Sequence, residues 1–144
     1  MIIEFALKLD AILIIIVSAV ATALVGGIIP KGNVTIGIIV FGVGMMLFTM
    51  IMGNAFAAFP VMTAGIGLPL LIHRHGADPA ILGSLGMLTG YCGTLLTPMA
   101  ANFNLVPAAL LELDDPNGVI RAQWATAVPL LAVNLALMAL LVFR

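Results

Sequence analysis

Charged residues divide this chain into long apolar runs separated by short polar segments. The uncharged runs are residues 11–30, 32–72, 79–111 and 122–143. A helix that crosses the hydrocarbon core of a bilayer needs roughly 20 apolar residues. The first and last runs have about this length, so we predict membrane spans over residues 11–30 and 121–143.

The two central runs are too long for one span, and each contains a polar or helix-breaking cluster near its middle. The first cluster begins at Gly53-Asn54 and the second at Thr97-Pro98. An unsatisfied backbone group in hydrocarbon costs several kcal/mol, so a break there must be covered by protein or line a wet cavity. The predicted segments are a span over residues 34–52 with a re-entrant segment 53–72, then a span over 80–97 with a broken segment 98–112.

Composition places the whole chain in the membrane class. The 144 residues are 63% hydrophobic and 8% charged, whereas a soluble domain is typically about 45–50% apolar and about 25% charged. So few charges could not cover the surface of a water-soluble body. We expect one all-α integral membrane domain over residues 1–144, with about four to six transmembrane or re-entrant helices and two broken or hairpin segments. The net charge of −1 provides no basic surface for nucleic acid.

The basic residues indicate an orientation. If each run makes one net crossing, Lys8, Arg74 and Arg144 share one side of the membrane, and Lys31 and Arg121 share the other. Because the side with more Lys and Arg is normally cytoplasmic, this count favours a cytoplasmic N-terminus.

The densest group of polar residues in an apolar run lies between Gly90 and Asn104. Pro98 lacks an N–H, so it frees helix carbonyls one turn earlier, near Thr94 and Thr97. These carbonyls, with the neighbouring hydroxyls and carboxamides, suit a cation or a small polar substrate. A helix that begins after a break also presents its N–H groups to an anion. Thr and Asn can instead merely hydrogen-bond to neighbouring helices, but we favour a site because intramembrane polar groups are usually functional.

The Gly53-Asn54 cluster is the second candidate, as the tip of an opposing hairpin that faces the same cavity. A plain loop at the membrane surface is the alternative. Both clusters share an Asn, aromatic, Pro layout, as matched broken helices of a transporter repeat would. The predicted substrate- or ion-binding residues are Asn54, Thr94, Thr97, Asn102 and Asn104. The predicted helix breaks are Gly53, Pro60, Gly93, Pro98 and Pro107.

The remaining candidates have simpler interpretations. Gly83, Gly86 and Gly90 share one helical face, and we expect them to pack against another helix. The His73-Arg74-His75 segment lacks a third metal ligand nearby, and the acidic segment 112–115 adjoins a turn sequence, so we expect both to be loops in water. The spans hold no nucleophile with a base. We therefore predict neither an enzyme nor a metal or cofactor site.

Two longer motifs resemble those of one bacterial membrane family, domain of unknown function nine-seven-nine. The motifs are MIMGNAFAAFPVM at residues 50–62 and GYCGTLLTPMAANFN at residues 90–104. Members of the family are regarded as permease subunits. The resemblance implies a transport-associated protein of the bacterial inner membrane, a companion subunit from a sister family, and a link to 5-oxoproline handling. It covers the C-terminal half of the family's longer members, so a complete site would need another chain.

Our leading hypothesis is a multi-pass secondary permease of the inner membrane, or the substrate-site half of one. It would bind a small polar or carboxylate solute, such as 5-oxoproline, at paired helix breaks, with H⁺ or Na⁺ as the coupling ion. The alternative is a non-transporting scaffold that stabilises a partner permease, for which the Gly83–Gly93 face would matter and the Asn residues would not. Besides the bilayer and a small-molecule substrate, we expect a second copy of the chain or a companion membrane subunit as partner.

Overall fold

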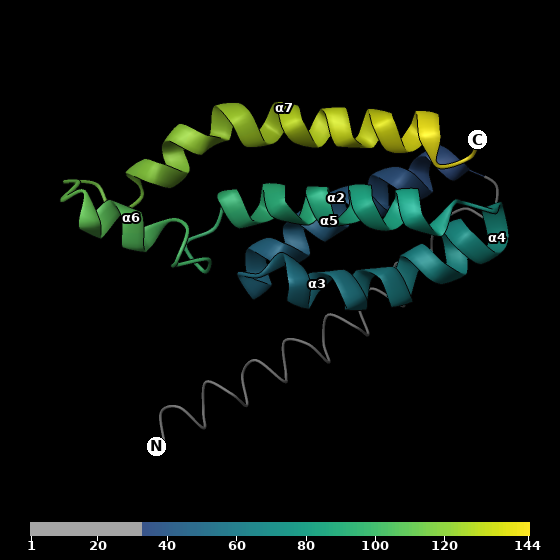
Figure 1. Ribbon diagram of the computed structural model, residues 1–144, viewed down its shortest axis with the longest axis horizontal. Helices are drawn as coiled ribbons and strands as arrows, with labels where there is room; N and C mark the ends of the chain where they lie inside the picture. The colour runs from purple at the N-terminus through teal and green to yellow at the C-terminus, as the bar shows by residue number, and fades with distance from the viewer. Residues whose placement is uncertain (1–32) are drawn as a thin grey trace, which may run out of the picture.

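The computed structural model describes residues 33–144, and every regular element in that range is a helix (Figure 1). The predicted span over residues 11–30 lies outside the described residues. The helices are α2 (Val34–Met52), α3 (Ala55–Met62), the π-helix η1 (Thr63–Ile72), α4 (His73–His75), α5 (Pro79–Leu95), α6 (Leu105–Leu110) and α7 (Gly118–Leu141).

Three helical segments are long and apolar enough to cross a membrane. They are α2, the continuous helix formed by α3, η1 and α4 (Ala55–His75), and α7. This confirms the predicted fold class, an all-α membrane protein. The 17 residues of α5 extend about 25 Å at 1.5 Å per residue, slightly less than the hydrocarbon core of about 30 Å.

Local sequence explains where the helices begin. The Asn33 side chain accepts a hydrogen bond from the Ile36 N–H (3.3 Å) and so caps α2. The Asp78 carboxylate accepts from the N–H groups of Ala80 and Ile81, both at 2.9 Å, and Pro79 at the first helical position has no N–H to satisfy. These side chains replace partners that the first turn of a helix cannot supply.

Residues 53–72 differ from the re-entrant segment that we predicted. A tight turn at Gly53-Asn54 is followed by one helix that continues to His75, and Pro60 lies inside it. A proline in a helix removes a donor and pushes its ring against an earlier carbonyl. Here the helix continues past Pro60 into the π-helix η1, which itself contains Pro69 and whose end is marked by a bond from the His73 N–H to the Leu68 carbonyl five residues earlier. The wider π-helical register accompanies a chain that stays helical past both prolines.

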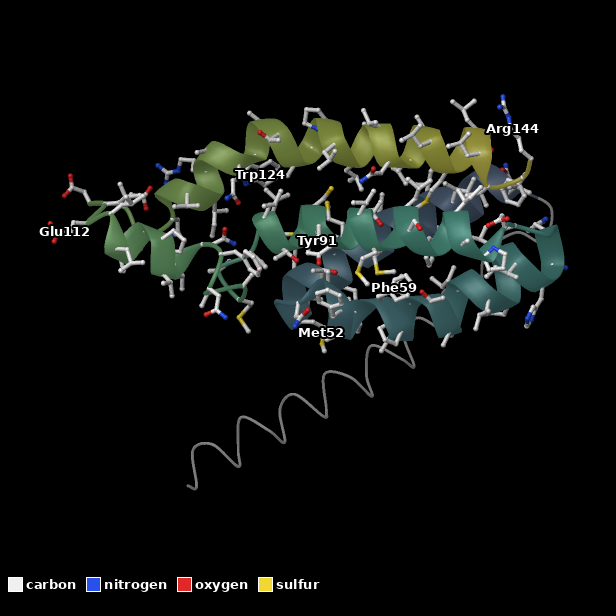
Figure 2. All side chains as sticks on the ribbon, in the orientation of Figure 1. Met52, Phe59, Tyr91, Glu112, Trp124 and Arg144 are labelled. Atoms are coloured by element: carbon white, nitrogen blue, oxygen red, sulfur yellow. The ribbon has the colours of Figure 1, made fainter. Side chains whose placement is uncertain are left out.

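This continuity changes the path of the chain through the bundle. Because α2 and the helix 55–75 each run the length of the bundle, the uncharged run 32–72 passes along it twice, whereas the orientation argument assumed one net passage. The start of α2 therefore lies at the same end as α4 and the C-terminus (Figure 1). Figure 2 shows Arg144 and Glu112 at opposite ends of the molecule.

We call these the basic end, which carries His73, Arg74 and Arg144, and the acidic end, which carries Glu112, Asp114 and Asp115. Lys8 and Lys31 lie outside the described residues. In the part of the chain that the structure describes, Arg74 and Arg144 at the basic end outnumber Arg121 at the acidic end, so the positive-inside rule favours a cytoplasmic basic end.

The helix α5 lies at the centre of the bundle and packs against α2, α3 and α7. The apolar core between these helices includes Phe41, Met45, Ile66, Leu82 and Met138, each 2% exposed or less. At the basic end, the Asp78 N–H donates to the Val142 carbonyl at 2.8 Å, which fastens the turn before α5 to the end of α7.

The predicted glycine face of α5 lies against its neighbours within this chain. A Cβ at Gly86 would stand 2.9 Å from the Phe41 ring, and one at Gly90 would stand 3.1 Å from the Ala55 Cβ. At Gly93 a Cβ would collide with the carbonyl oxygen of Met46. The small residues therefore let the backbones of α2 and α5 approach closely, as small-residue faces do between membrane helices. Gly83 meets only the edge of Phe59, at 3.6 Å.

Candidate functional site

The two polar clusters, far apart in sequence, lie side by side near the acidic end of the bundle. The first is the turn between α2 and α3, and the second is the loop 96–104 that follows α5. The Thr97 hydroxyl donates a hydrogen bond of 2.7 Å to the Met50 carbonyl in the last turn of α2. This bond joins the two clusters directly.

Gly53 makes the closest approach between them. Its φ of 70° is left-handed, which ends α2 and favours glycine. A Cβ at this position would also stand 2.6 Å from the Met99 carbonyl oxygen of the facing loop. Both the turn and the contact therefore require a residue without a side chain.

A pocket of about 340 Å³ opens between the turn and the loop. Three of the predicted binding residues, Asn54, Thr94 and Asn102, line it, whereas Thr97 and Asn104 do not. Two aromatic side chains add to the wall, with the Phe56 and Tyr91 rings packed edge to face at a centroid distance of 6.0 Å. The other lining residues are Gly53, Ala55, Met99, Ala100, Ala101 and Phe103.

Among the described residues, no charged side chain lines this pocket. Its polar groups are the carboxamides of Asn54 and Asn102, the Tyr91 phenol and the Thr94 hydroxyl. The Asn54 oxygen accepts a hydrogen bond from the Phe56 N–H (2.8 Å), which caps α3 and leaves the NH₂ of the carboxamide to donate to a ligand. The site can therefore hold a small molecule by hydrogen bonds and not by ion pairs.

Asn104 closes the end of α5. It is fully buried, and its NH₂ group donates to the carbonyls of Thr94 (2.9 Å) and Thr97 (2.7 Å). The Thr94 carbonyl would ordinarily accept from the residue four positions on, but that residue is Pro98, which has no N–H. Pro98 thus frees the Thr94 carbonyl, as the sequence indicated, and this carbonyl accepts a hydrogen bond from the Asn104 side chain of the same loop.

Thr97 also acts within the chain. Besides donating to Met50, its hydroxyl oxygen accepts from the Met99 N–H at 3.2 Å. The structure therefore places Thr97 and Asn104 as residues that shape the loop, where the sequence predicted ligands. The reason is that both side chains lie closer to freed backbone groups than to the pocket.

The predicted helix breaks divide into three groups. Gly53 ends α2, and Pro98 lies just past the end of α5. Pro60 and Gly93 lie inside helices that continue past them. Pro107 lies in the first turn of α6, where a backbone N–H has no acceptor within the helix. The missing N–H of proline therefore costs nothing there.

Asn134 and Thr49 are buried polar residues that were not among the predicted site residues. Asn134 on α7 is 2% exposed, and its NH₂ group lies 3.9 Å from the Cys92 sulfur on α5. The Thr49 hydroxyl, at the α2–α5 contact, is buried without a hydrogen-bond partner among the described residues. The signal for Asn134 was a lone Asn in the uncharged run 122–143, and the signal for Thr49 was its place one helical turn before the Gly53-Asn54 break.

Comparison with known proteins gives one match. Residues 14–143 match the family described as Protein of unknown function (DUF979), which confirms the resemblance drawn from the two motifs. No curated protein and no solved structure matches the chain.

Proposed function

We propose that this chain, which belongs to the DUF979 family, is a membrane transport protein or the substrate-binding half of one. We further propose that it binds a small polar or carboxylate solute in the pocket between the Gly53-Asn54 turn and the loop 96–104. The family description assigns no activity. The proposal therefore stands on the geometry of this pocket.

One observation carries the proposal. Two interruptions of apolar helices, more than forty positions apart in sequence, meet and line the same pocket, each contributing one carboxamide from Asn54 and Asn102. Transporters commonly bind their substrates where two interrupted helices meet. Two plain surface loops would have no reason to converge on a shared hollow.

The chemistry of the lining favours a neutral polar molecule or a single carboxylate. The Asn54 and Asn102 carboxamides and the Tyr91 hydroxyl can donate to a carboxylate, and the pocket adjoins the first turn of the helix 55–75, whose positive dipole end favours an anion. A cyclic amide acid such as 5-oxoproline offers acceptors and a donor for such a site. H⁺ or Na⁺ would drive its uptake.

Direct binding tests this proposal. The purified chain, in detergent and in liposomes, is titrated with 5-oxoproline and with related monocarboxylates, by thermal shift and by uptake of labelled solute. In Asn102→Ala the loss of one hydrogen bond of about 1–1.5 kcal/mol should weaken binding about tenfold. Asn54→Ser keeps the helix cap while removing the NH₂ group, so it should weaken binding similarly.

Two matched variants serve as controls. Asn33→Ser changes the corresponding helix cap at the opposite end of the bundle, and Asn117→Ala removes an exposed carboxamide from the loop before α7. Both should leave binding unchanged. If Asn102→Ala and Asn54→Ser bind the solute as tightly as the unaltered protein does, the pocket is not the binding site.

The scaffold alternative also has an observation in its favour. In the most apolar stretch of α7, only 17% of the residues are buried within the bundle, whereas 39% are buried in each of the other two candidate spans. The outer face of α7 is therefore open to a companion membrane subunit or a second copy. The Gly83–Gly93 face, which we had expected to serve this role, packs against α2 and α3 of the same chain. Copurification that depends on α7, with solute binding absent, would favour the scaffold.

A further inference from the structure

A short lobe projects beyond the end of α5 at the acidic end. We define the α6 lobe as residues 99–117, which comprise α6 and the segments on either side of it. Figure 1 shows α6 past the end of α5 and beside the start of α7. Within the described residues it packs against α7. It lies outside the apolar core of the bundle.

The α6 lobe exposes large apolar side chains. Leu110 is 79% exposed and Leu111 is 68% exposed, more than any other large hydrophobic side chains among the described residues. The other exposed apolar side chains of the lobe are Met99, Phe103, Val106 and Leu113. We call these six side chains the apolar patch of the lobe. So many exposed large apolar side chains in one short segment are rarely left to water and indicate a surface that contacts something apolar.

The depth of the lobe is set by α7. Phe143 precedes Arg144 at the basic end and marks one boundary of the hydrocarbon core. The core takes roughly 20 helical residues, so the opposite boundary on α7 lies near Trp124. Trp is enriched at this boundary, and Trp124 is half exposed. The turns of α7 before Trp124 therefore lie at headgroup level.

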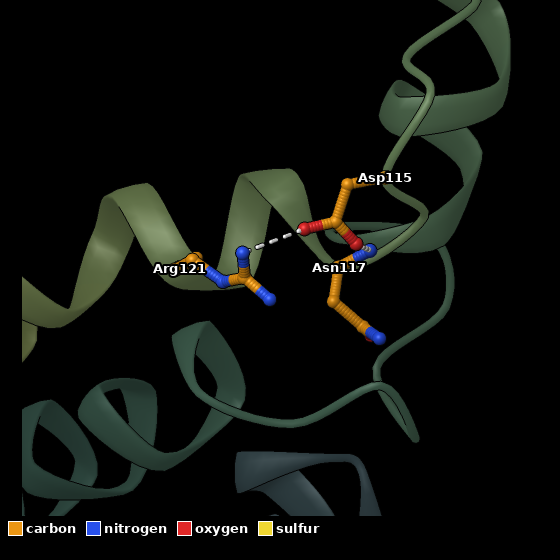
Figure 3. Close-up of polar contacts among 3 residues, drawn as sticks. All are labelled: Asp115, Asn117 and Arg121. Atoms are coloured by element: carbon orange, nitrogen blue, oxygen red, sulfur yellow. Dashed lines mark hydrogen bonds and ion pairs between the residues drawn. The ribbon is translucent and has the colours of Figure 1, made fainter.

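The lobe is held level with those first turns. The Leu113 side chain lies 3.5 Å from where a Cβ of Gly118 would stand. The Asp115 carboxylate pairs with Arg121 at 3.2 Å and also accepts from the Asn117 N–H at 2.9 Å (Figure 3). These contacts join the end of the lobe to the first turns of α7.

The polar groups of the lobe lie at its tip. Figure 2 shows Glu112 at the end of the molecule farthest from Arg144. The exposed Leu110 and Leu111 lie directly beside this carboxylate, and such a mixture of apolar and charged side chains suits the boundary between acyl chains and water. We propose that the α6 lobe is an interfacial element whose apolar side chains insert into the headgroup–acyl boundary of the leaflet at the acidic end. The inference does not depend on the function of the pocket.

Tryptophan fluorescence in vesicles tests the insertion. Trp124 is the sole Trp of the sequence, so a Trp124→Phe background allows single reporters at Leu110→Trp and, as a matched control at the tip, Asp114→Trp. The full chain is reconstituted in phosphatidylcholine vesicles that carry a shallow spin-labelled lipid, and aqueous iodide is the second quencher. We expect the spin label to quench Leu110→Trp at least twofold more than Asp114→Trp, and iodide to show the reverse order.

Other results would overturn the proposal. Equal iodide quenching of both reporters would place the lobe in water. A Leu110→Trp reporter shielded from both quenchers would indicate that a second copy or another protein covers the patch. The unaltered protein offers a further measurement, because Trp124 is its own reporter and needs no substitution. If Trp124 lies at the inferred depth, the shallow lipid label should quench its fluorescence more than iodide does.

Discussion

Replacing Gly93 by alanine tests the close contact on which the bundle depends. Gly93 lies on α5 where the backbone of α2 passes, and a Cβ there would collide with the Met46 carbonyl oxygen and stand 2.9 Å from the Thr49 Cβ. The colliding atom is backbone, so no side chain can rotate away. Either α5 or α2 must shift.

The magnitude follows from two opposing effects. Alanine gains about 1 kcal/mol over glycine in a helix interior, while a methyl group forced into a packed interior costs about 1–3 kcal/mol. Because backbone meets backbone at Gly93, the cost lies at the upper end, and the variant should be less stable by about 1–2 kcal/mol. Gly83→Ala on the same helix adds only an ordinary 3.6 Å contact with Phe59 and should be neutral or up to about 1 kcal/mol more stable.

The assay is reversible unfolding in mixed micelles of detergent and SDS, followed by far-UV circular dichroism. The two variants should differ by about 1–3 kcal/mol, or about fivefold or more in the unfolding equilibrium constant. If Gly93→Ala were as stable as Gly83→Ala, α2 and α5 would not approach at Gly93 as described, and the glycine-face argument would fail.

The remaining predictions concern polar contacts and use the same unfolding assay. Asn104→Ala leaves the Thr94 carbonyl without a donor and leaves the Thr97 carbonyl with the Ala100 N–H alone, at 3.3 Å, so it should cost about 1–3 kcal/mol; a cost below about 1 kcal/mol would contradict its role in closing α5. Asn54→Ala should cost about 1 kcal/mol as a lost helix cap, and Asn54→Ser should restore most of it; equal stabilities would argue against the cap. Asp115→Ala breaks the exposed pair with Arg121 and should change stability by less than about 1 kcal/mol, so a larger loss would mean that the pair holds the lobe.

Much of the architecture could be predicted because its causes are local. The apolar runs indicate helices that cross a membrane, and the ends of α2 follow from a capping residue, Asn33, and a left-handed Gly53. Residues 53–72 could not be predicted in the same way. Whether a proline breaks a helix or is absorbed by a wider turn depends on what the helix packs against, and the π-helix after Pro60 is stabilised by the core around Ile66 and Leu71.

The candidate site was predictable in its members and not in their roles. The sequence singled out Asn54 and Asn102, which do line the pocket, together with Thr97 and Asn104, which do not. All four are polar residues beside a break, and the pattern alone is the same for each. Their roles separate only in three dimensions, where a freed carbonyl lies within reach of Asn104 and none lies within reach of Asn102 among the described contacts.

The hydrogen bond from Thr97 to the Met50 carbonyl has a mechanical consequence. It ties the loop after α5 to the end of α2, and Gly53 packs against the same loop, so the two walls of the pocket are held together. In the transport function that we propose, a solute held there would not be released by pulling the walls apart without breaking these contacts. Any motion that changes which side of the membrane the pocket faces would therefore carry both walls together against the rest of the protein.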